Sequence, residues 1–384
     1  MIKCVKCGLP ETFETIEFGP DGVCNVCVQH NFKKDVIDWS SRKLMLDKVI
    51  EENRGKYEYD CIVPFSGGKD STFTLYYLMK EYNLKPLVVQ FNHGFMRPQL
   101  LKNNERTFKE LGVDVHSFTP NWNLVKRVML EALIRKGDFC WHCHTGIFAY
   151  PMHVAIKYNT PLVLWGEPST EYTAYYDYRD NEIEVVDESR FNKIVNLGIT
   201  AEDMRGMIED DLNKYDARDF AAFTYPPTRD LKKLRYQSLC LGSFIPWDTK
   251  MQSKLIMDEL GWEGDEVEGM PPKMYDYEKI ECSMQGVRDY IKFLKRGYSR
   301  VTQMTVLDIR NGRMSKDEAE KLIERYEGKK PQSLNLFLEY VGISEEEFNQ
   351  IVAKTVVVPH KQDFKIDEWN PKTHDYEQWY SKKS

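Results

Sequence analysis

The stretch VPFSGGKDSTFTL, Val63 to Leu75, places a glycine turn with a lysine and an aspartate between an apolar run and helix-forming residues. The apolar run predicts a buried strand, and the residues after the turn predict a helix. At such a junction, backbone N–H groups and the helix N-terminus converge on one point, where an anion is stabilised. The turn is not a Walker A loop, which has Gly at the place of Val63 and Ser or Thr at the place of Asp70. The stretch therefore predicts an anion-binding loop rather than an ordinary turn with surface charges.

The segments around this loop alternate between short apolar runs and helical patterns. Because nearly all residues of most runs are apolar, helices are expected on both faces of the sheet. The order strand, helix, strand, helix favours an α/β fold with an open parallel sheet. Strands are predicted at 61–65, 86–92, 113–119 and 161–166, and helices at 71–83, 100–112, 123–137 and 146–158.

Three regions are predicted along the chain. Residues 1–40 form a cysteine-bearing, zinc-ribbon-like segment, residues 41–265 an α/β domain that carries the anion-binding loop, and residues 266–384 a helical C-terminal region. Within the second region, 171–235 reads as an insertion beside the site. In the third, capping boxes at Ser315…Glu318 and Ser344…Glu347 predict two helix starts.

Composition narrows the class of protein. The chain has 384 residues, 42% of them hydrophobic, and a formal net charge of -7. It has no apolar run near the ~20 residues that a membrane helix needs, and no secretory signal is visible at the N-terminus. We therefore expect a cytoplasmic protein without a membrane span. The acidic balance makes nucleic acid an unlikely main partner.

Four cysteines near the N-terminus form two knuckles, Cys4-x-x-Cys7 and Cys24-x-x-Cys27. Two such pairs supply four thiolates, which is the usual pattern of a structural zinc ribbon. Because a segment of this size lacks a core of its own, bound Zn²⁺ would provide its folding free energy. The alternative is a set of free thiols in a disordered arm.

A second cysteine pair, Cys140 and Cys143, cannot close a metal site alone. Cys240 is the further thiol that we expect to join it, and three thiolates suit a [4Fe–4S] cluster or an open zinc site. His142 or His144 could supply a ligand instead, and a buried thiol pair without metal is the other alternative. Cys282 has no visible partner in the sequence.

The six residues Ser66-Gly67-Gly68-Lys69-Asp70-Ser71 resemble the PP-loop of the ATP pyrophosphatases, which cleave ATP between the α- and β-phosphates. The resemblance implies that this loop binds the pyrophosphate end of ATP and that Asp70 helps to hold Mg²⁺. It also implies that the nucleotide lies beside Phe91 and Asn92 after the second strand and Gly166 after the fourth.

A resemblance across residues 1–360 separates two enzyme classes that share this loop. The ribbon, PFSGGKDSTF, FCWHCHTGI, LVLWGEPSTEY and DIRNGRMSKDEAEKLIERY together resemble the N-acetyl sugar amidotransferases of the WbpG and PseA type. These enzymes act in the biosynthesis of lipopolysaccharide O-antigen and of flagellin glycans that carry pseudaminic acid. The alternative, a PP-loop tRNA sulfurtransferase with an iron–sulfur cluster, shares the loop, the Cys140–Cys143 knuckle and the cysteine triad.

The family resemblance implies that ATP adenylates the acetamido oxygen of an N-acetyl sugar and that ammonia then replaces this oxygen. Lys69 and Asp70 would act on the phosphates, and Glu167 is the candidate general base; binding Mg²⁺ or capping a helix are its other possible roles. Arg229, Lys232 and Lys233 are candidates for contacts with anionic groups of the sugar or for a solvated face.

The nitrogen source is expected to be another protein. A Gly-x-Cys-x-Gly nucleophile elbow is absent, because Ser238 stands at the first glycine of SLCLG. The resemblance implies a separate glutaminase that supplies ammonia through a cyclase-like channel partner.

Overall fold

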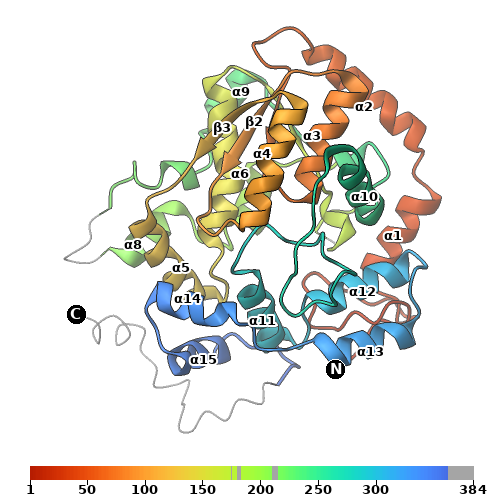
Figure 1. The fold of residues 1–384 in the computed structure, drawn as a ribbon, viewed down its shortest axis with the longest axis vertical. Coiled ribbons are helices and arrows are strands. Elements are labelled where there is room, and N and C mark those ends of the chain that lie inside the picture. The colour runs from red at the N-terminus through yellow and green to blue at the C-terminus, as the bar shows by residue number, and fades with distance from the viewer. Residues whose placement is uncertain (174, 180–182, 210–214, 362–384) are drawn as a thin grey trace.

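The computed structural model describes residues 1–173, 175–179, 183–209 and 215–361. Its centre is a five-stranded, all-parallel sheet with the strand order β3-β2-β1-β4-β5 (Figure 1). The strands are β1 (Cys61–Pro64), β2 (Pro86–Phe91), β3 (Asp114–Phe118), β4 (Leu162–Trp165) and β5 (Gln237–Cys240). The order reverses direction beside β1, and ligands bind at such switch points at the carboxyl ends of parallel strands. The glycine turn directly follows β1.

Helices cover both faces of this sheet and continue beyond it. The helices up to the last strand are α1 (Asn25–Asp35), α2 (Trp39–Asn53), α3 (Lys69–Tyr82), α4 (Pro98–Leu111), α5 (Trp122–Lys136), α6 (Trp141–Lys157), α7 (Glu188–Arg190), α8 (Ala201–Ile208) and α9 (Thr228–Leu234). The later ones are α10 (Thr249–Leu260), α11 (Gln285–Arg296), α12 (Arg300–Arg310), α13 (Lys316–Tyr326), α14 (Ser333–Val341) and α15 (Glu345–Ala353). None of the helices in the described part of the chain is both long and apolar enough to cross a bilayer.

Alternate residues of the strands build two cores. Cys61 and Val63 of β1 pack in the cluster that contains the apolar residues of α3, α4 and α10. Ile62, between them, packs with α6 in the cluster on the opposite face. This alternation follows from the period of two in a strand, and burial on both faces explains why the strands read as continuous apolar runs.

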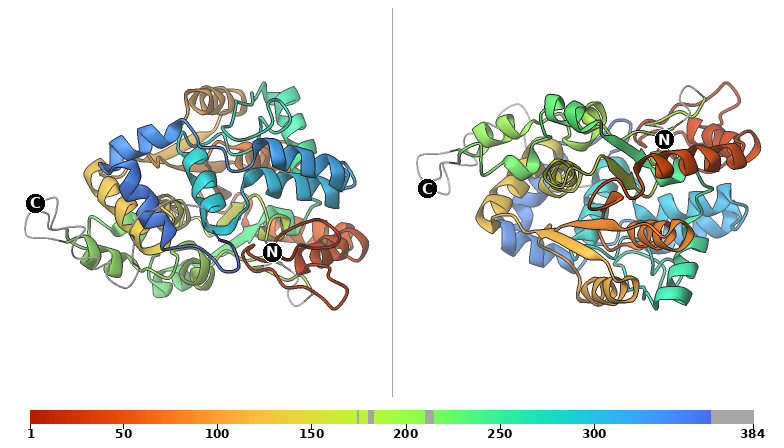
Figure 2. Two further views of the ribbon diagram at one scale, coloured as in Figure 1. Left: turned by 90° about the horizontal axis from the view of Figure 1, so that it is seen from below. Right: turned by 90° about the horizontal axis from the view of Figure 1, so that it is seen from above.

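The C-terminal helices lie at the end of the sheet where the loops after the strands emerge (Figures 1 and 2). Helices α11, α14 and α15 pack with α5 around Phe337 and Phe348. Just before α11, the Ser283 N–H donates to the carbonyl of Phe95 in the loop after β2, at 2.8 Å. The C-terminal region therefore covers the edge of the sheet at which the glycine turn lies.

The fold class predicted from the sequence is confirmed, and each of the four predicted strands agrees with the observed one to within about a residue at each end. Both capping boxes are present, at the starts of α13 and α15. Two features differ. Helix α6 begins at Trp141, so that Cys143 lies in its first turn, and the short strand β5 was not predicted.

Candidate functional site

The glycine turn has the geometry of an anion-binding loop. Gly67 adopts a φ of +85°, which favours glycine, and Gly68 is the N-cap of α3. Ser71 Oγ accepts the Gly67 N–H at 3.1 Å and lies 3.3 Å from Ser66 Oγ, so the two hydroxyls brace the turn. Because Gly68 has no capping side chain, the first N–H groups of α3 are available to a ligand.

The turn leaves no room for larger residues. A Cβ on Gly67 would lie 2.1 Å from Asn104 Oδ1, and one on Gly68 would lie 1.9 Å from Glu281 Oε1. Asn104 is 4% exposed, and neither polar atom of its side chain has a hydrogen-bond partner among the described residues. A buried amide without a partner beside a glycine cradle fits a polar ligand such as a phosphate.

Lys69 is held in a buried network of charges that the C-terminal region completes. Its Nζ lies 2.7 Å from Asp70 Oδ2 and 2.7 Å from Glu278 Oε2. Arg300 in turn lies 3.3 Å from Glu278 and 3.3 Å from Asp289. Burial alone would lower the pKa of Lys69, but the carboxylates of Asp70 and Glu278 raise this pKa well above its usual value. Lys69 is therefore a fixed positive charge at the base of the loop.

We expect Glu278→Gln to lower the free energy of unfolding by about 3 kcal/mol. This loss is at the lower end of the range for removing one partner of a buried ion pair, because Lys69 and Arg300 each keep a second acidic partner. Equilibrium unfolding in urea measures it. The control is Asp258→Asn, which removes the partner of Lys254 in a pair whose side chains are 75% and 58% exposed and should change stability by less than about 1 kcal/mol.

The same network predicts a pH dependence of stability. Burial raises the pKa of Glu278, but Lys69, Lys279 and Arg300 together bring it to about 2, below its usual 4.5. The stability that Glu278 contributes is therefore complete above pH 4.5 and is lost as the pH falls toward 2. Between these limits, the wild type should lose more stability than Glu278→Gln. Equal slopes in the two proteins would contradict the network.

A cavity of about 290 Å³ opens beside the loop. Its walls come from the glycine turn, the loop after β2, the start of α6, the ends of β4 and β5, the segment around α7, and the segment around the start of α11. The residues with ligand or acid–base chemistry are Ser66, Asp70, Ser71, His93, Cys140, His142, Cys143, His144, Glu167, Arg190, Cys240, Lys279, Glu281, Cys282, Gln285 and Arg288. Gly166 also lines it.

Three carboxylates face this cavity with an oxygen that has no hydrogen-bond partner within the described residues: Asp70, Glu167 and Glu281. Oxygen ligands of this kind suit Mg²⁺ bound together with substrate phosphates. The carboxylates thus fit the ion that the PP-loop resemblance implies. Burial, and then the neighbouring charge of Asp70, raise the pKa of Glu167 to about 8. Near neutral pH this side chain can therefore both hold and release a proton.

The loop after β4, which carries Glu167, is held from outside by the N-terminal segment. Glu171 in this loop forms a buried ion pair with Lys33 of α1, and its carbonyl accepts from Arg310 at 3.3 Å. Gln29 of α1 accepts the N–H of Tyr178 at 3.2 Å. The cysteine-bearing segment is therefore coupled by direct contacts to one wall of the cavity.

Some candidate residues lie away from this cavity. Phe91 packs against Phe118 and Phe223 in a hydrophobic cluster, and Asn92 donates to Thr119 Oγ1 at 3.2 Å. Neither residue lines the cavity, so their contact with the nucleotide stays a prediction. Arg229 on α9 is 87% exposed and paired with Asp230, and it does not reach the cavity; nor do Lys232 and Lys233.

All three cysteines of the predicted triad, Cys140, Cys143 and Cys240, line the cavity. Within the described residues, however, their sulfur atoms do not all lie within 4.8 Å of one another. Sequence reasoning missed the contribution of Lys279, Glu281, Cys282 and Arg288, since no local motif marks them. Cys282, which had no visible partner in the sequence, lines the same cavity as the triad.

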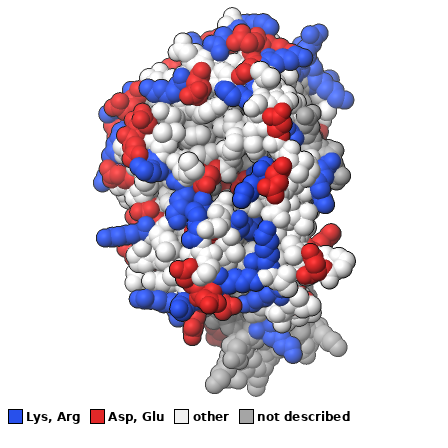
Figure 3. Space-filling view, turned by 90° about the vertical axis from the view of Figure 1, so that its right-hand side faces the viewer, with Lys and Arg blue, Asp and Glu red and all other residues white. Residues whose placement is uncertain are grey.

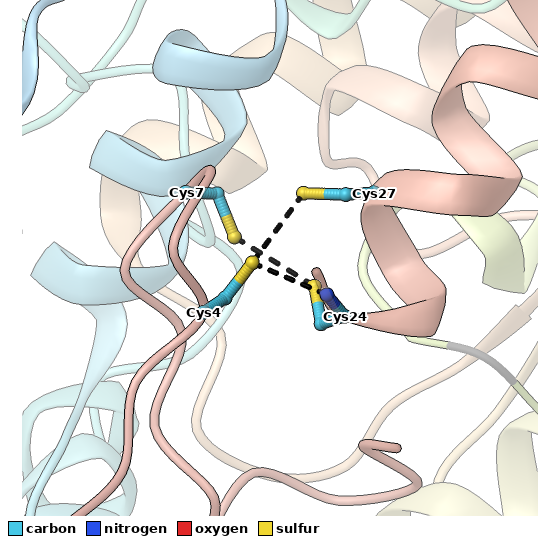
Figure 4. A group of neighbouring side chains, drawn as sticks. All are labelled: Cys4, Cys7, Cys24 and Cys27. Atoms are coloured by element: carbon cyan, nitrogen blue, oxygen red, sulfur yellow. Dashed lines mark hydrogen bonds between the residues drawn. The ribbon is translucent and has the colours of Figure 1, made fainter. Parts of the chain in front are cut away.

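The four N-terminal cysteines form a group that could hold a metal ion (Figure 4). Their sulfur atoms lie within 4.8 Å of one another, with Cys4–Cys27 at 4.0 Å and Cys7–Cys24 at 3.8 Å. These distances exceed a disulfide bond, but they fit tetrahedral zinc, for which Zn–S bonds of about 2.3 Å place the sulfurs about 3.8 Å apart. All four are buried, as in a closed structural site.

Part of the chain matches a protein family model. Residues 273–379 match the family model described as "LPS biosynthesis protein WbpG-like, C-terminal domain". A curated relative is an uncharacterized protein, MJ1599, of Methanocaldococcus jannaschii, which is 27% identical over 141 residues. That alignment covers 31% of this chain and 50% of the relative, so the chain spans about half of that protein's length.

A solved structure was also found, the U34-tRNA thiolase NcsA from Methanococcus maripaludis with its [4Fe–4S] cluster. The match covers 87% of this chain and 91% of that chain, at 15% identity and a TM-score of 0.31, which is too low a likeness to assign an activity. The family match is the informative one. Residues 273–379 are similar to the C-terminal domain of WbpG-like proteins, in agreement with the resemblance in the sequence.

Proposed function

We propose that this protein is an ATP-dependent amidotransferase of bacterial surface-glycan biosynthesis, which converts the acetamido group of an N-acetyl sugar into an acetamidino group. One observation carries the proposal: the glycine turn and a segment of the WbpG-like C-terminal domain line the same cavity. The first supplies a site for phosphates. The second belongs to a family described by its role in lipopolysaccharide biosynthesis.

The proposed reaction proceeds in two balanced steps. The acetamido oxygen attacks the α-phosphorus of ATP, pyrophosphate leaves, the amide N–H proton passes to a base, and the product is an O-adenylyl imidate. Ammonia then adds to the imidate carbon, and the C–O bond breaks so that AMP departs with the former acetamido oxygen. The nitrogen loses its extra proton to a base, which leaves the amidine. The first step turns a very poor electrophile into one with a good leaving group.

Residues that line the cavity, and the buried Lys69 beside it, have chemistry suited to these steps. The loop N–H groups and Lys69 would stabilise the charge that develops on the departing pyrophosphate. Asp70, with Glu281 beside it, would hold Mg²⁺, which neutralises charge on phosphate oxygens. Glu167 has a pKa raised to about 8 and would accept the proton from the attacking amine. The free ammonia would come from a partner glutaminase through a channel protein.

The surface charge supports a small substrate over RNA. On the face shown in Figure 3, lysines and arginines are interspersed with acidic residues. The net charge of the whole chain is -7. Nucleic-acid affinity depends on clustered positive charge. The use of ATP and the set of free cysteines are consistent with the cytoplasm.

Mass spectrometry with ¹⁵N-ammonium tests the proposal. The protein, ATP and Mg²⁺ are incubated with a panel of N-acetylated nucleotide sugars and free nonulosonic and uronic sugars. We expect one sugar to gain a single ¹⁵N in place of oxygen, in an amount equal to the AMP formed. Parallel reactions with bulk tRNA and a sulfide donor test the sulfurtransferase. Thiolated tRNA without any labelled sugar would overturn the proposal.

A further inference from the structure

The cavity beside the PP-loop contains a fourth cysteine, Cys282, which the C-terminal domain supplies. Cys140 and Cys143 line the cavity from the start of α6, and Cys282 lies close before α11. These three residues pack in one cluster together with Phe139 and Met284. Cys140 is buried in this cluster, and Cys143 and Cys282 are half-buried against it.

Cys240 has different surroundings. It ends β5 and packs in the cluster on the α6 face of the sheet, whereas the other three cysteines belong to a different cluster. Its thiol points to the carbonyl of Glu167, at 3.8 Å, and the charges that act on it most strongly are those of Glu184 and Arg190. Although Cys240 borders the cavity, its contacts attach it to the loop after β4.

The position of Cys282 is fixed by the backbone. Residues Met96 and Cys282 form an antiparallel bridge, and the Ser283 N–H donates to Phe95 O at 2.8 Å. The Met284 N–H donates to the Sγ of Cys282 at 3.3 Å. Amide hydrogen bonds of this kind stabilise a metal-bound thiolate and tune iron–sulfur clusters.

Two features beside the three thiols are suited to a negatively charged group. Cys140 is the N-cap of α6 and Cys143 lies in its first turn, where the helix dipole stabilises thiolates. Arg288, one turn into α11, faces the same cavity, and its Nε has no hydrogen-bond partner in the described part of the chain. Arg288 would therefore supply the positive charge that a buried group of thiolates needs.

The spacing distinguishes a cluster from a single ion. Among the described residues, the four ribbon cysteines form the group of three or more potential ligands whose ligand atoms all lie within 4.8 Å of one another. Cys140, Cys143 and Cys282 do not form such a group, so at least two of their sulfur atoms are more than 4.8 Å apart. The sulfur atoms around a single zinc ion lie about 3.8 Å from one another. An iron–sulfur cluster binds each cysteine through a different iron, so the cysteine sulfur atoms around it lie farther apart than those around one zinc ion.

We propose that Cys140, Cys143 and Cys282, rather than Cys240, bind a [4Fe–4S] cluster whose fourth iron faces the cavity. The C-terminal domain would then provide a ligand, and the cluster would form only when that domain is docked on the α/β domain. This inference concerns the metal site and does not depend on which substrate the protein modifies.

Iron and sulfide analysis of matched variants tests it. The full-length wild type, Cys282→Ser and Cys240→Ser are purified anaerobically, reconstituted with iron and sulfide, and desalted. We expect about four iron and four sulfide ions per wild-type chain, with a broad visible absorption. Cys282→Ser should lose roughly tenfold or more of this iron, and Cys240→Ser should keep it. One zinc ion per chain in each variant, bound by the ribbon, reports that the protein is folded.

Three outcomes would overturn the inference: full iron in Cys282→Ser, loss of iron in Cys240→Ser, or a wild type that binds zinc instead of iron at this site. A Cys282→Ala variant repeats the comparison if the serine variant does not fold. Because the readout is metal content, its failure is distinguishable from failure of the proposed function. A protein that labels a sugar with ¹⁵N but holds no iron would disprove the cluster alone.

Discussion

Lys69→Met should abolish AMP formation, with a loss of roughly 10³-fold or more in rate. The substitution keeps most of the side-chain volume and removes the positive charge at the base of the loop. Because Lys69 is 1% exposed and paired with both Asp70 and Glu278, the variant should also be less stable. Release of pyrophosphate in the presence of sugar and ammonium measures the activity, and urea unfolding measures the stability.

A double variant separates these two effects. Lys69→Met with Glu278→Gln removes one charge of each sign from the buried network, so it should regain part of the stability that Lys69→Met loses. It should remain inactive, because the phosphates still lack their cation. If the double variant recovered activity together with stability, Lys69 would have a structural role and no direct role at the phosphates.

The double variant Cys24→Ser, Cys27→Ser should lose its zinc and unfold the N-terminal segment. Structural zinc contributes on the order of 10 kcal/mol to such small segments, and the apolar cluster that this segment shares with Tyr298 and Val306 is small. Because Lys33 and Gln29 of this segment contact the loop after β4, the activity should fall as well. Metal analysis and limited proteolysis measure the two structural effects.

Cys61→Ser, a buried change in β1, is the control for the loss of a thiol elsewhere. It should keep one zinc ion per chain. Zinc that persists in the double variant at the wild-type amount would mean that the metal is bound by other residues. Zinc loss without any change in activity would show that the contacts with the loop after β4 do not matter for the site.

Local sequence patterns predicted the parts of the site that are local in sequence. The glycine turn, the strand before it and the helix after it lie within Val63–Leu75, and their chemistry follows from that order. The ribbon cysteines and the capping boxes of α13 and α15 are also short motifs. In each case the residues that interact are a few positions apart, so a pattern can reveal them.

The remaining parts of the site depend on contacts between distant segments. Glu278 and Cys282 reach the loop and the cavity only because the C-terminal helices pack at the carboxyl edge of the sheet. Nothing in the sequence near either residue specifies this docking. Strand β5, Gln237–Cys240, was missed for another reason: it has only four residues, two polar ones followed by two apolar ones. So short a pattern does not differ from that of a loop.

In the proposed reaction, ATP activates the acetamido oxygen of a sugar. A substrate labelled with ¹⁸O in its acetamido carbonyl tests this most directly, in a reaction with ATP, Mg²⁺ and ammonium. If the oxygen is adenylated, the label must leave with the nucleotide, and mass spectrometry should find one ¹⁸O in the phosphate of each AMP formed. Recovery of the label in inorganic phosphate, or of unlabelled AMP beside amidinated sugar, would contradict the proposed mechanism.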